Sequence, residues 1–185
     1  MKITCIDFET ANHQKESACS LGIACIAGNS IVERKEWLIK PAKGFGFFIP
    51  EFTDIHGLDW FDVKSAASFD NIYSELIPYL DEAVLVAHNA HFDMMVLAGL
   101  LNLYKIPFPD SKYFCTLQAA RRVWPGMEGY RLNQLCRMLG HEFTHHKAGS
   151  DADAAGHLLL AMMKEKQAAS ISELADILDL PFGYL

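Results

Sequence analysis

The chain has 185 residues, of which 51% are hydrophobic, so it can build one sizeable core but not two comfortable domains. Its formal net charge of −7 argues against a broad basic nucleic-acid-binding face, although metal ions at an acidic site can still hold a substrate with phosphates. The five cysteines lack the paired spacing of a zinc site, and we expect them to be reduced thiols in a cytoplasmic protein. We recognise no signal peptide and no apolar stretch of about 18 residues, so we expect no secretion and no membrane span.

The first ten residues contain the stretch around which we expect the chain to be organised. Ile3 to Ile6 is predicted to be a buried strand, and Asp7 and Glu9 follow at its carboxyl end. Because side chains alternate along a strand, both carboxylates project from one face, where they repel each other unless a cation lies between them. A divalent metal ion is the usual cation, and the alternative is a strand end with two solvated acids.

The first half of the chain predicts strands before helices. Residues 18–27 and 31–40 are further apolar runs, so the first 40 residues predict a three-stranded antiparallel meander. A loop over 41–50 precedes a short helical turn over residues 53–58, which Gly57 closes, and Ser68 is expected to cap a helix that runs to about Leu80.

From residue 83 onward, strands alternate with helices. The wholly apolar residues 83–87 predict a central strand, and later segments predict a helix at 90–103, a strand at 112–115 and helices at 116–124, 132–139, 151–164 and 171–178. This order predicts an α/β fold in which a mixed five-stranded sheet, with three antiparallel strands and then parallel ones, is flanked by helices. We expect residues 1–167 to form the main domain and residues 168–185 to form a helical extension packed on it.

A third carboxylate, Asp93, is predicted to lie in the first turn of the helix that follows the central strand. If that strand is parallel to the first one, both strands end at the same edge of the sheet, where α/β proteins place ligands. Asp93 would then approach Asp7 and Glu9. The alternative is that Asp93 complements the helix dipole and that Asn89 is only an N-cap.

The segment from His145 to Asp153 supplies a fourth carboxylate and candidate bases. Ser150 and Asp153 have the spacing of a capping box, which would place Asp151 in the first turn of a helix. His146 lies on the loop before it, and a histidine beside a metal cluster is suited to take a proton from water. Solvated surface histidines are the alternative for His141, His145 and His146.

Together these motifs resemble those of the DnaQ-like, or DEDDh, 3′→5′ exonucleases, which include the proofreading epsilon subunit of DNA polymerase III, ribonuclease T and oligoribonuclease. The family pattern Asp-x-Glu-Thr is matched by residues 7–10, His-Asn-Ala-x-Phe-Asp by residues 88–93, and His-x4-Asp-Ala by His146, Asp151 and Ala152. The resemblance covers about residues 1–165 and implies a ribonuclease H-like fold. Cys115 replaces the commoner Asp of the family, outside the expected metal ligands.

The resemblance implies hydrolysis of phosphodiester bonds at the 3′ end of single-stranded DNA, in proofreading or repair, with release of nucleoside 5′-monophosphates. Asp7 would bridge two Mg²⁺ or Mn²⁺ ions, Glu9 and Asp151 would complete the first, and Asp93 would support the second. His146 would deprotonate the attacking water. Residues that the resemblance and their positions suggest as substrate contacts are Phe8, Thr10, His56, Leu58, Asn89 and Phe92. For both phenylalanines, packing in the core is the alternative.

Several alternatives stay open at this point. RNA 3′-end trimming and degradation of short oligoribonucleotides use the same motifs, and an inactive domain that binds nucleic acid or a polymerase is a more distant alternative. Besides a nucleic-acid 3′ end, the expected partners are a DNA polymerase subunit or a sliding clamp. Residues 177–182 faintly resemble a clamp-binding peptide, but an amphipathic helix packed on the core explains them equally well. The oligomeric state is left open.

Overall fold

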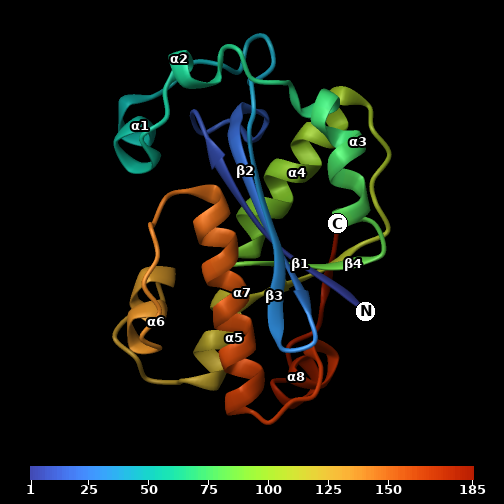
Figure 1. The fold of residues 1–185 in the computed structure, drawn as a ribbon, viewed down its shortest axis with the longest axis vertical. Helices are drawn as coiled ribbons and strands as arrows, with labels where there is room; N and C mark the ends of the chain where they lie inside the picture. The colour runs from blue at the N-terminus through green and yellow to red at the C-terminus, as the bar shows by residue number, and fades with distance from the viewer.

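The apolar runs of the sequence form one continuous sheet in the computed structural model, which describes residues 1–185 (Figure 1). The predicted meander consists of β1 (Lys2–Thr10), β2 (Ala18–Ala27) and β3 (Ser30–Leu38), paired antiparallel. β4 (Ala83–Ala87) runs parallel to β1, and β5 (Lys112–Cys115) runs parallel to β4. The predicted mixed α/β fold is therefore confirmed.

The sheet has six strands where five were predicted, in the order β3-β2-β1-β4-β5-β6. The additional strand, β6 (Gly183–Tyr184), pairs antiparallel with the outer edge of β5. A strand of two residues contains no periodicity that a sequence could reveal. It brings the C-terminal segment to an edge of the sheet.

Helices cover both faces of the sheet (Figure 1). On one face lie α3 (Phe69–Leu80) and α4 (Ala90–Tyr104). On the other face lie α5 (Thr116–Val123), α6 (Leu132–Met138), α7 (Ala148–Glu165) and α8 (Ile171–Ile177). The connections contain η1 (Lys15–Ser17), α1 (Pro50–His56) and α2 (Trp60–Val63), a single turn that was not predicted.

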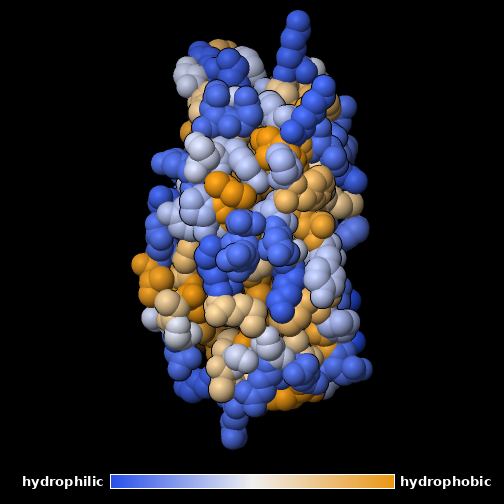
Figure 2. Space-filling model, turned by 90° about the vertical axis from the view of Figure 1, so that its right-hand side faces the viewer, coloured by the Kyte–Doolittle hydropathy of each residue, from blue (hydrophilic) through white to orange (hydrophobic).

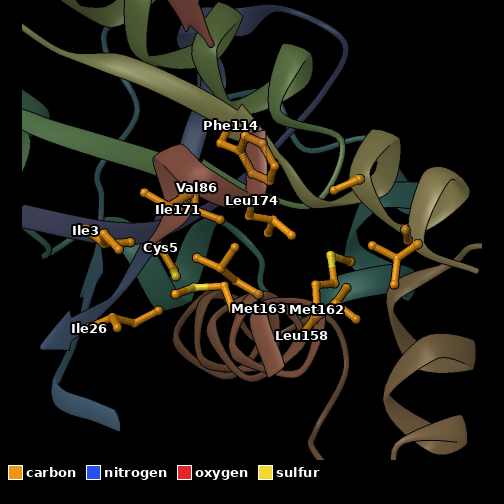
Figure 3. Packing of buried hydrophobic residues seen from close by; sticks show 14 of the residues in the cluster. Ile3, Cys5, Ile26, Val86, Phe114, Leu158, Met162, Met163, Ile171 and Leu174 are labelled. Atoms are coloured by element: carbon orange, nitrogen blue, oxygen red, sulfur yellow. The ribbon is translucent and has the colours of Figure 1, made fainter. Parts of the chain in front are cut away.

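The alternation of side chains along β1 separates two hydrophobic cores. Ile3 and Cys5 face the core formed with α5 to α8, whereas Ile6 and Phe8 face the core formed with α3 and α4. Figure 3 shows the first of these cores, in which side chains of the sheet meet those of α7 and α8. Asp7 and Glu9 continue the series of Ile3 and Cys5, so the strand directs both carboxylates toward the side of the sheet that α7 covers.

The start of α7 corrects the predicted capping box. The helix begins at Ala148, three residues earlier than predicted, and neither Ser150 nor Asp153 caps it. Ser150 Oγ instead accepts a hydrogen bond from Thr144 N–H, and Asp153 forms an ion pair with Arg34 on β3. Similarly, Ser68 precedes α3 but makes no side-chain cap bond to the helix backbone.

Gly22 on β2 allows α7 to begin directly on the sheet. It lies opposite Asp7 in the β1–β2 register, and a Cβ atom at this position would lie 2.1 Å from the carbonyl carbon and oxygen of Ala148. Any side chain would therefore push the first turn of α7, which carries Asp151, away from β1. The identity of residue 22 thus controls the distance between segments more than a hundred residues apart in sequence.

We expect Gly22→Ala to lower the free energy of unfolding by about 3 kcal/mol, because the backbone of Ala148 cannot yield as a flexible side chain would. Urea unfolding would measure the change. Gly99→Ala is the matched control, since its Cβ would lie 3.1 Å from Lys15 Cβ and the helix gains propensity, so we expect a change below about 1 kcal/mol. Equal stability of both variants would contradict a close approach at Gly22.

The C-terminal segment packs on the rest of the chain. Leu178 and Leu180 are each 6% exposed and belong to the core between the sheet and α5 to α8. Arg122 on α5 donates hydrogen bonds to the carbonyl oxygens of Leu178 and Asp179. This agrees with the packing explanation of residues 177–182, although the division of the chain at residue 167 stays a prediction.

Hydrophilic and hydrophobic side chains are interspersed on the side of the molecule where α3 lies (Figure 2). None of the helices combines the length and the apolar character that crossing a lipid bilayer requires.

Candidate active site

Two carboxylates of the site come from the end of β1, and a third comes from α7. One oxygen atom from each of Asp7, Glu9 and Asp151 lies within 4.8 Å of the others. Asp151 is 3% exposed, and its Oδ2 accepts a hydrogen bond from Lys147 N–H at 3.0 Å. The predicted approach of these three side chains is therefore present in the structure.

Asp93 reaches the same region from the first turn of α4. It is 2% exposed, and its Oδ1 accepts a hydrogen bond from Phe8 N–H at 3.0 Å, which ties the start of α4 to β1 between the two strand carboxylates. Because β4 is parallel to β1, both strands end at this edge of the sheet, as the prediction required. Asp93 does not belong to the group of three oxygens within 4.8 Å.

The carboxylates of the site repel one another. Burial raises the pKa of Asp7 well above its ordinary value, and the charges of Asp93, Asp151 and Glu9 raise it further. Burial likewise raises the pKa of Asp93 and of Asp151, and it raises the pKa of Glu9 to about 7, with Lys147 acting in the opposite direction. Carboxylates that repel one another and offer only oxygen atoms as ligands are suited to bind a hard divalent cation.

The carboxylates open into a cleft of about 510 Å³. Besides Asp7, Glu9, Asp93 and Asp151, the cleft is lined by Phe8, His88, Asn89, Phe92, Leu117, Arg121, Tyr130, Arg131, Leu132, His145 and His146. Acidic groups thus share one cleft with aromatic and basic side chains. An extended polyanion with flat bases could contact all three kinds.

Both His145 and His146 line the cleft, although the sequence motif selected His146 alone. His145 Nδ1 lies 2.6 Å from Asp151 Oδ1, and the rings of the two histidines stack with centroids 3.8 Å apart. His146 has a φ of 63°, an uncommon conformation for a residue other than glycine. Burial, aided by the neighbouring His145, lowers the pKa of His146 from its ordinary value.

The six predicted substrate contacts divide into two groups. Asn89 and Phe92 line the cleft, and Phe92 is 37% exposed. Phe8 also borders the cleft, but its ring belongs to the core with α3 and α4, so stacking on a base is left to Phe92. Asn89 is the N-cap residue of α4, as the alternative expected, but it adopts the left-handed conformation and its side chain makes no capping hydrogen bond.

Thr10, His56 and Leu58 lie outside the lining of the cleft. The buried His56 ring connects the other two: Nε2 lies 3.2 Å from Thr10 O, and Nδ1 accepts a hydrogen bond from Leu58 N–H at 3.0 Å. A carbonyl oxygen only accepts, so Nε2 carries the proton and the imidazole is neutral. Burial lowers the pKa of His56, in agreement. Its nitrogens hold α1 against the end of β1.

Seven residues of the cleft were not among the predicted site residues, and His88, Arg121, Tyr130 and Arg131 are four of them. His88 is held by Tyr130 O, 2.9 Å from Nε2, and Thr116 Oγ1, 3.0 Å from Nδ1, and burial lowers its pKa to about 4. The family pattern over residues 88–93 begins with His88 and offered a signal for this residue. Tyr130 and Arg131 lie between α5 and α6 and carried no signal in the sequence.

A family model described as Exonuclease, RNase T, matches residues 4–159. The 3'-5' exonuclease DinG of Bacillus subtilis (strain 168) is 32% identical over 166 residues, which are 86% of this chain and 17% of that protein. A DNA polymerase III PolC-type of Halalkalibacterium halodurans is 33% identical over 145 residues, 76% of this chain and 10% of the polymerase. The chain thus spans less than a fifth of either relative.

Solved structures give the same fold at lower sequence identity. Exonuclease X in complex with 5' overhanging duplex DNA superposes with a TM-score of 0.76 and 23% identity, and the match covers 95% of this chain and 99% of that chain. Exonuclease I superposes with a TM-score of 0.74 and 17% identity, covering 95% of this chain and 42% of that chain. At these identities the likeness is one of fold.

Proposed function

Because this chain belongs to the RNase T family of exonucleases, we propose that it is a 3′→5′ exonuclease that removes nucleotides from the 3′ end of single-stranded DNA and releases nucleoside 5′-monophosphates. The observation that carries the proposal is the convergence of Asp7, Glu9 and Asp151, with Asp93 beside them, in the lining of an open cleft. Carboxylates so placed have a direct role in divalent-metal chemistry and no evident role in stability, because their charges repel one another.

Asp7, Glu9 and Asp151 would hold a divalent metal ion, and Asp93 would support a second one beside Asp7. When bound, two such ions supply a hydroxide nucleophile at neutral pH and stabilise the leaving 3′ oxygen. An all-oxygen set of carboxylates favours Mg²⁺ or Mn²⁺ over Zn²⁺. The carboxylates of the cleft repel one another, and bound cations would neutralise this repulsion, which supports a role for these ions.

The other residues of the cleft would orient the strand and move the proton. His146, with its pKa lowered by burial, is neutral at physiological pH and would accept a proton from the attacking water. Phe92 would stack on a base, which favours a single strand with little sequence preference. Arg121 and Arg131 line the same cleft and would contact phosphate oxygens. The net charge of −7 is consistent with a footprint of a few nucleotides.

The relatives favour DNA as the substrate. The DinG relative is named a 3'-5' exonuclease, and the PolC-type relatives are named DNA polymerases. RNA trimming remains the alternative, since no residue of the cleft separates ribose from deoxyribose by its position. A replicative polymerase is the partner that we would test first, because the matched segment is part of a polymerase chain in the PolC-type relatives.

We do not extend the proposal to a sliding clamp. Leu178 and Leu180, which a clamp-binding peptide would have to present, are buried, and β6 attaches the end of the chain to β5. Binding to a clamp would therefore require this segment to leave the core.

We expect 5′-labelled single-stranded DNA to be shortened stepwise from its 3′ end in Mg²⁺ or Mn²⁺, at least about tenfold faster than RNA of the same sequence, which corresponds to about 1.4 kcal/mol of discrimination. A ladder of labelled products on a denaturing gel would record direction and rate. A duplex with a recessed 3′ end and an oligonucleotide blocked by a 3′-phosphate serve as comparison substrates.

The experiment distinguishes the proposed function from its two alternatives. Faster cleavage of RNA would support the trimming alternative. Binding of either substrate without metal-dependent shortening would instead favour an inactive nucleic-acid-binding domain.

A further inference from the structure

A second group of metal-binding side chains lies outside the carboxylate cleft. His141 comes from the loop between α6 and α7, whereas Asp153 and His157 lie one turn apart on α7. One ligand atom from each residue lies within 4.8 Å of the others. Asp151 and Asp153 are two residues apart on the helix, which directs their side chains to nearly opposite sides. The cluster of His141, Asp153 and His157 is therefore distinct from the site described above.

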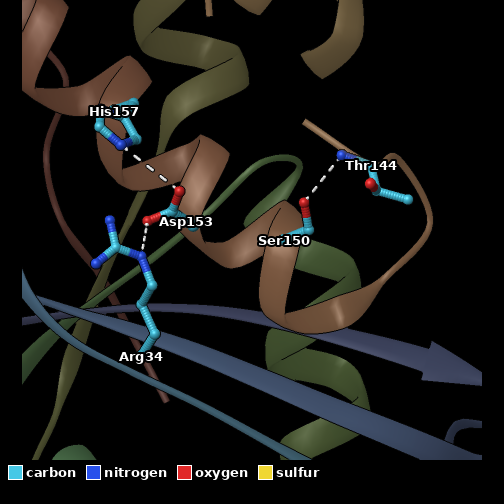
Figure 4. A network of polar contacts seen from close by, with 5 residues as sticks. All are labelled: Arg34, Thr144, Ser150, Asp153 and His157. Carbon is cyan, nitrogen blue, oxygen red and sulfur yellow. Dashed lines mark hydrogen bonds and ion pairs between the residues drawn. The ribbon is translucent and has the colours of Figure 1, made fainter. Parts of the chain in front are cut away.

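Asp153 has one oxygen engaged and one directed at a histidine. Its Oδ1 accepts a charge-assisted hydrogen bond from Arg34 Nε at 2.6 Å, and its Oδ2 lies 3.5 Å from His157 Nε2 (Figure 4). Carboxylates that bind metal ions are commonly held by a second hydrogen-bonding group in this way. The His141 and His157 rings lie side by side, with centroids 4.2 Å apart and an interplanar angle of 34°.

His141 contains a buried polar atom without a partner. Its Nε2 is shielded from solvent and makes no hydrogen bond. Buried polar atoms are nearly always satisfied, and leaving one unpaired is costly. A nitrogen that serves as a metal ligand needs no such bond, so a bound ion would account for the position of this ring.

We propose that His141, Asp153 and His157 bind a divalent transition-metal ion, with water completing its coordination. Imidazole nitrogens favour ions such as Zn²⁺ over Mg²⁺, and three protein ligands with an open position form a common zinc geometry. This ligand set differs in chemistry from the four carboxylates of the cleft. The guanidinium of Arg34 opposes a cation, so the affinity is expected to be lower than that of a structural zinc site.

The ion would restrain the loop that precedes α7. His141 lies at the start of residues 139–147, and His145 and His146 lie near the end of the same loop. A bond network from His141 through the ion to α7 would cross-link this loop to the helix that supplies Asp151. Metal binding at this cluster would thus order the two cleft histidines without contacting a substrate.

The test is a Zn²⁺ titration of the full chain, followed calorimetrically and without substrate. Asp7→Asn combined with Glu9→Gln serves as the background, because it removes the competing carboxylate site. We expect one Zn²⁺ per chain, and we expect added His141→Gln or His157→Gln to weaken binding at least about tenfold, the range seen even for residues that only support a ligand. His13→Gln, an exposed histidine elsewhere, is the matched control and should leave the affinity unchanged.

A second measurement needs neither of the histidine variants. Hydrogen exchange of residues 139–147 in the background protein should slow when Zn²⁺ is added, while exchange in α3 stays unchanged. Absence of Zn²⁺ binding, or binding that neither histidine substitution weakens, would overturn the proposal. Because no substrate is used, that result would leave the proposed nuclease function untouched.

Discussion

Asp7→Asn is expected to abolish metal-dependent cleavage and, at the same time, to stabilise the metal-free protein above neutral pH. The carboxylate is the central ligand of the proposed site. Without it, the metal ions would no longer stabilise the transition state of cleavage by several kcal/mol, so we expect the rate to fall at least about 10³-fold. When no metal is bound, the charge of this half-buried group beside Asp93, Asp151 and Glu9 is unfavourable. Asparagine retains the size of the side chain without this charge.

The direction of the stability change follows from the raised pKa values. Unfolded carboxyl groups have their ordinary pKa near 4, whereas Asp7 and Glu9 have higher pKa values in the folded chain. The folded state therefore binds more protons, and stability is fully present below the unfolded pKa and is lost as pH rises through the folded pKa. For Glu9, the pKa rises from 4.5 to about 7 on folding, so the free energy of unfolding lost between these pH values is at most about 3 kcal/mol.

Gel assays and urea unfolding in a chelator at about pH 5 and about pH 8 would measure both effects. Asp176→Asn, the same chemical change at an exposed position on α8, is the matched control and should alter neither. Mg²⁺ should stabilise the wild type and have little effect on Asp7→Asn, because a ligand stabilises only the state that binds it. Retained cleavage by Asp7→Asn would remove the basis of the proposed function.

Most of the sheet was predictable because its strands are apolar and separated by turn residues. The wholly apolar β4 and the alternation along β1 indicated a buried sheet with Asp7 and Glu9 on one face. β6 and α2 were missed because elements of two and four residues contain too little pattern. Short elements form where tertiary contacts support them and not from local propensity.

The convergence of the carboxylates was predictable, but its physical cause was not. Parallel pairing of β1 and β4 could be inferred from the order of strands and helices. It places the start of α4 at the edge of the sheet where Asp7 and Glu9 lie. The close approach of Asp151 depends on Gly22, and a single glycine in a strand does not reveal which backbone will lie against it. The expected capping box failed because Asp151 itself accepts the Lys147 N–H, while Arg34 attracts Asp153.

The roles of His145 and His146 also depend on loop conformation. Spacing selected His146, yet His145 is the residue that contacts Asp151 in the structure. Nothing in the sequence indicates that His146 adopts a positive φ or that its ring stacks on that of His145. The two histidines therefore have to be separated by experiment.

We expect His146→Ala to lower kcat by about 10²- to 10⁴-fold, the usual contribution of a general base, and His145→Ala to lower it by less than about tenfold. In the wild type, kcat should fall as the pH decreases through a value below 6.5, since burial lowers the pKa of His146 and the base must be neutral to accept a proton. His146→Ala should lose this acidic limb. Steady-state rates on single-stranded DNA across pH would measure both.

His145 is expected to act on the metal rather than on the proton. Its Nδ1 lies 2.6 Å from Asp151 Oδ1, an oxygen that a bound ion would need, so His145 competes with the metal for this carboxylate. His145→Ala should therefore reach half-maximal activity at a lower Mn²⁺ concentration, whereas His146→Ala should leave that concentration unchanged. If His145→Ala were the variant that lost the acidic limb, the contact in the structure, and not the spacing of the motif, would identify the base. Glutamine at either position provides the conservative comparison, because it retains polarity and length but cannot take up the proton.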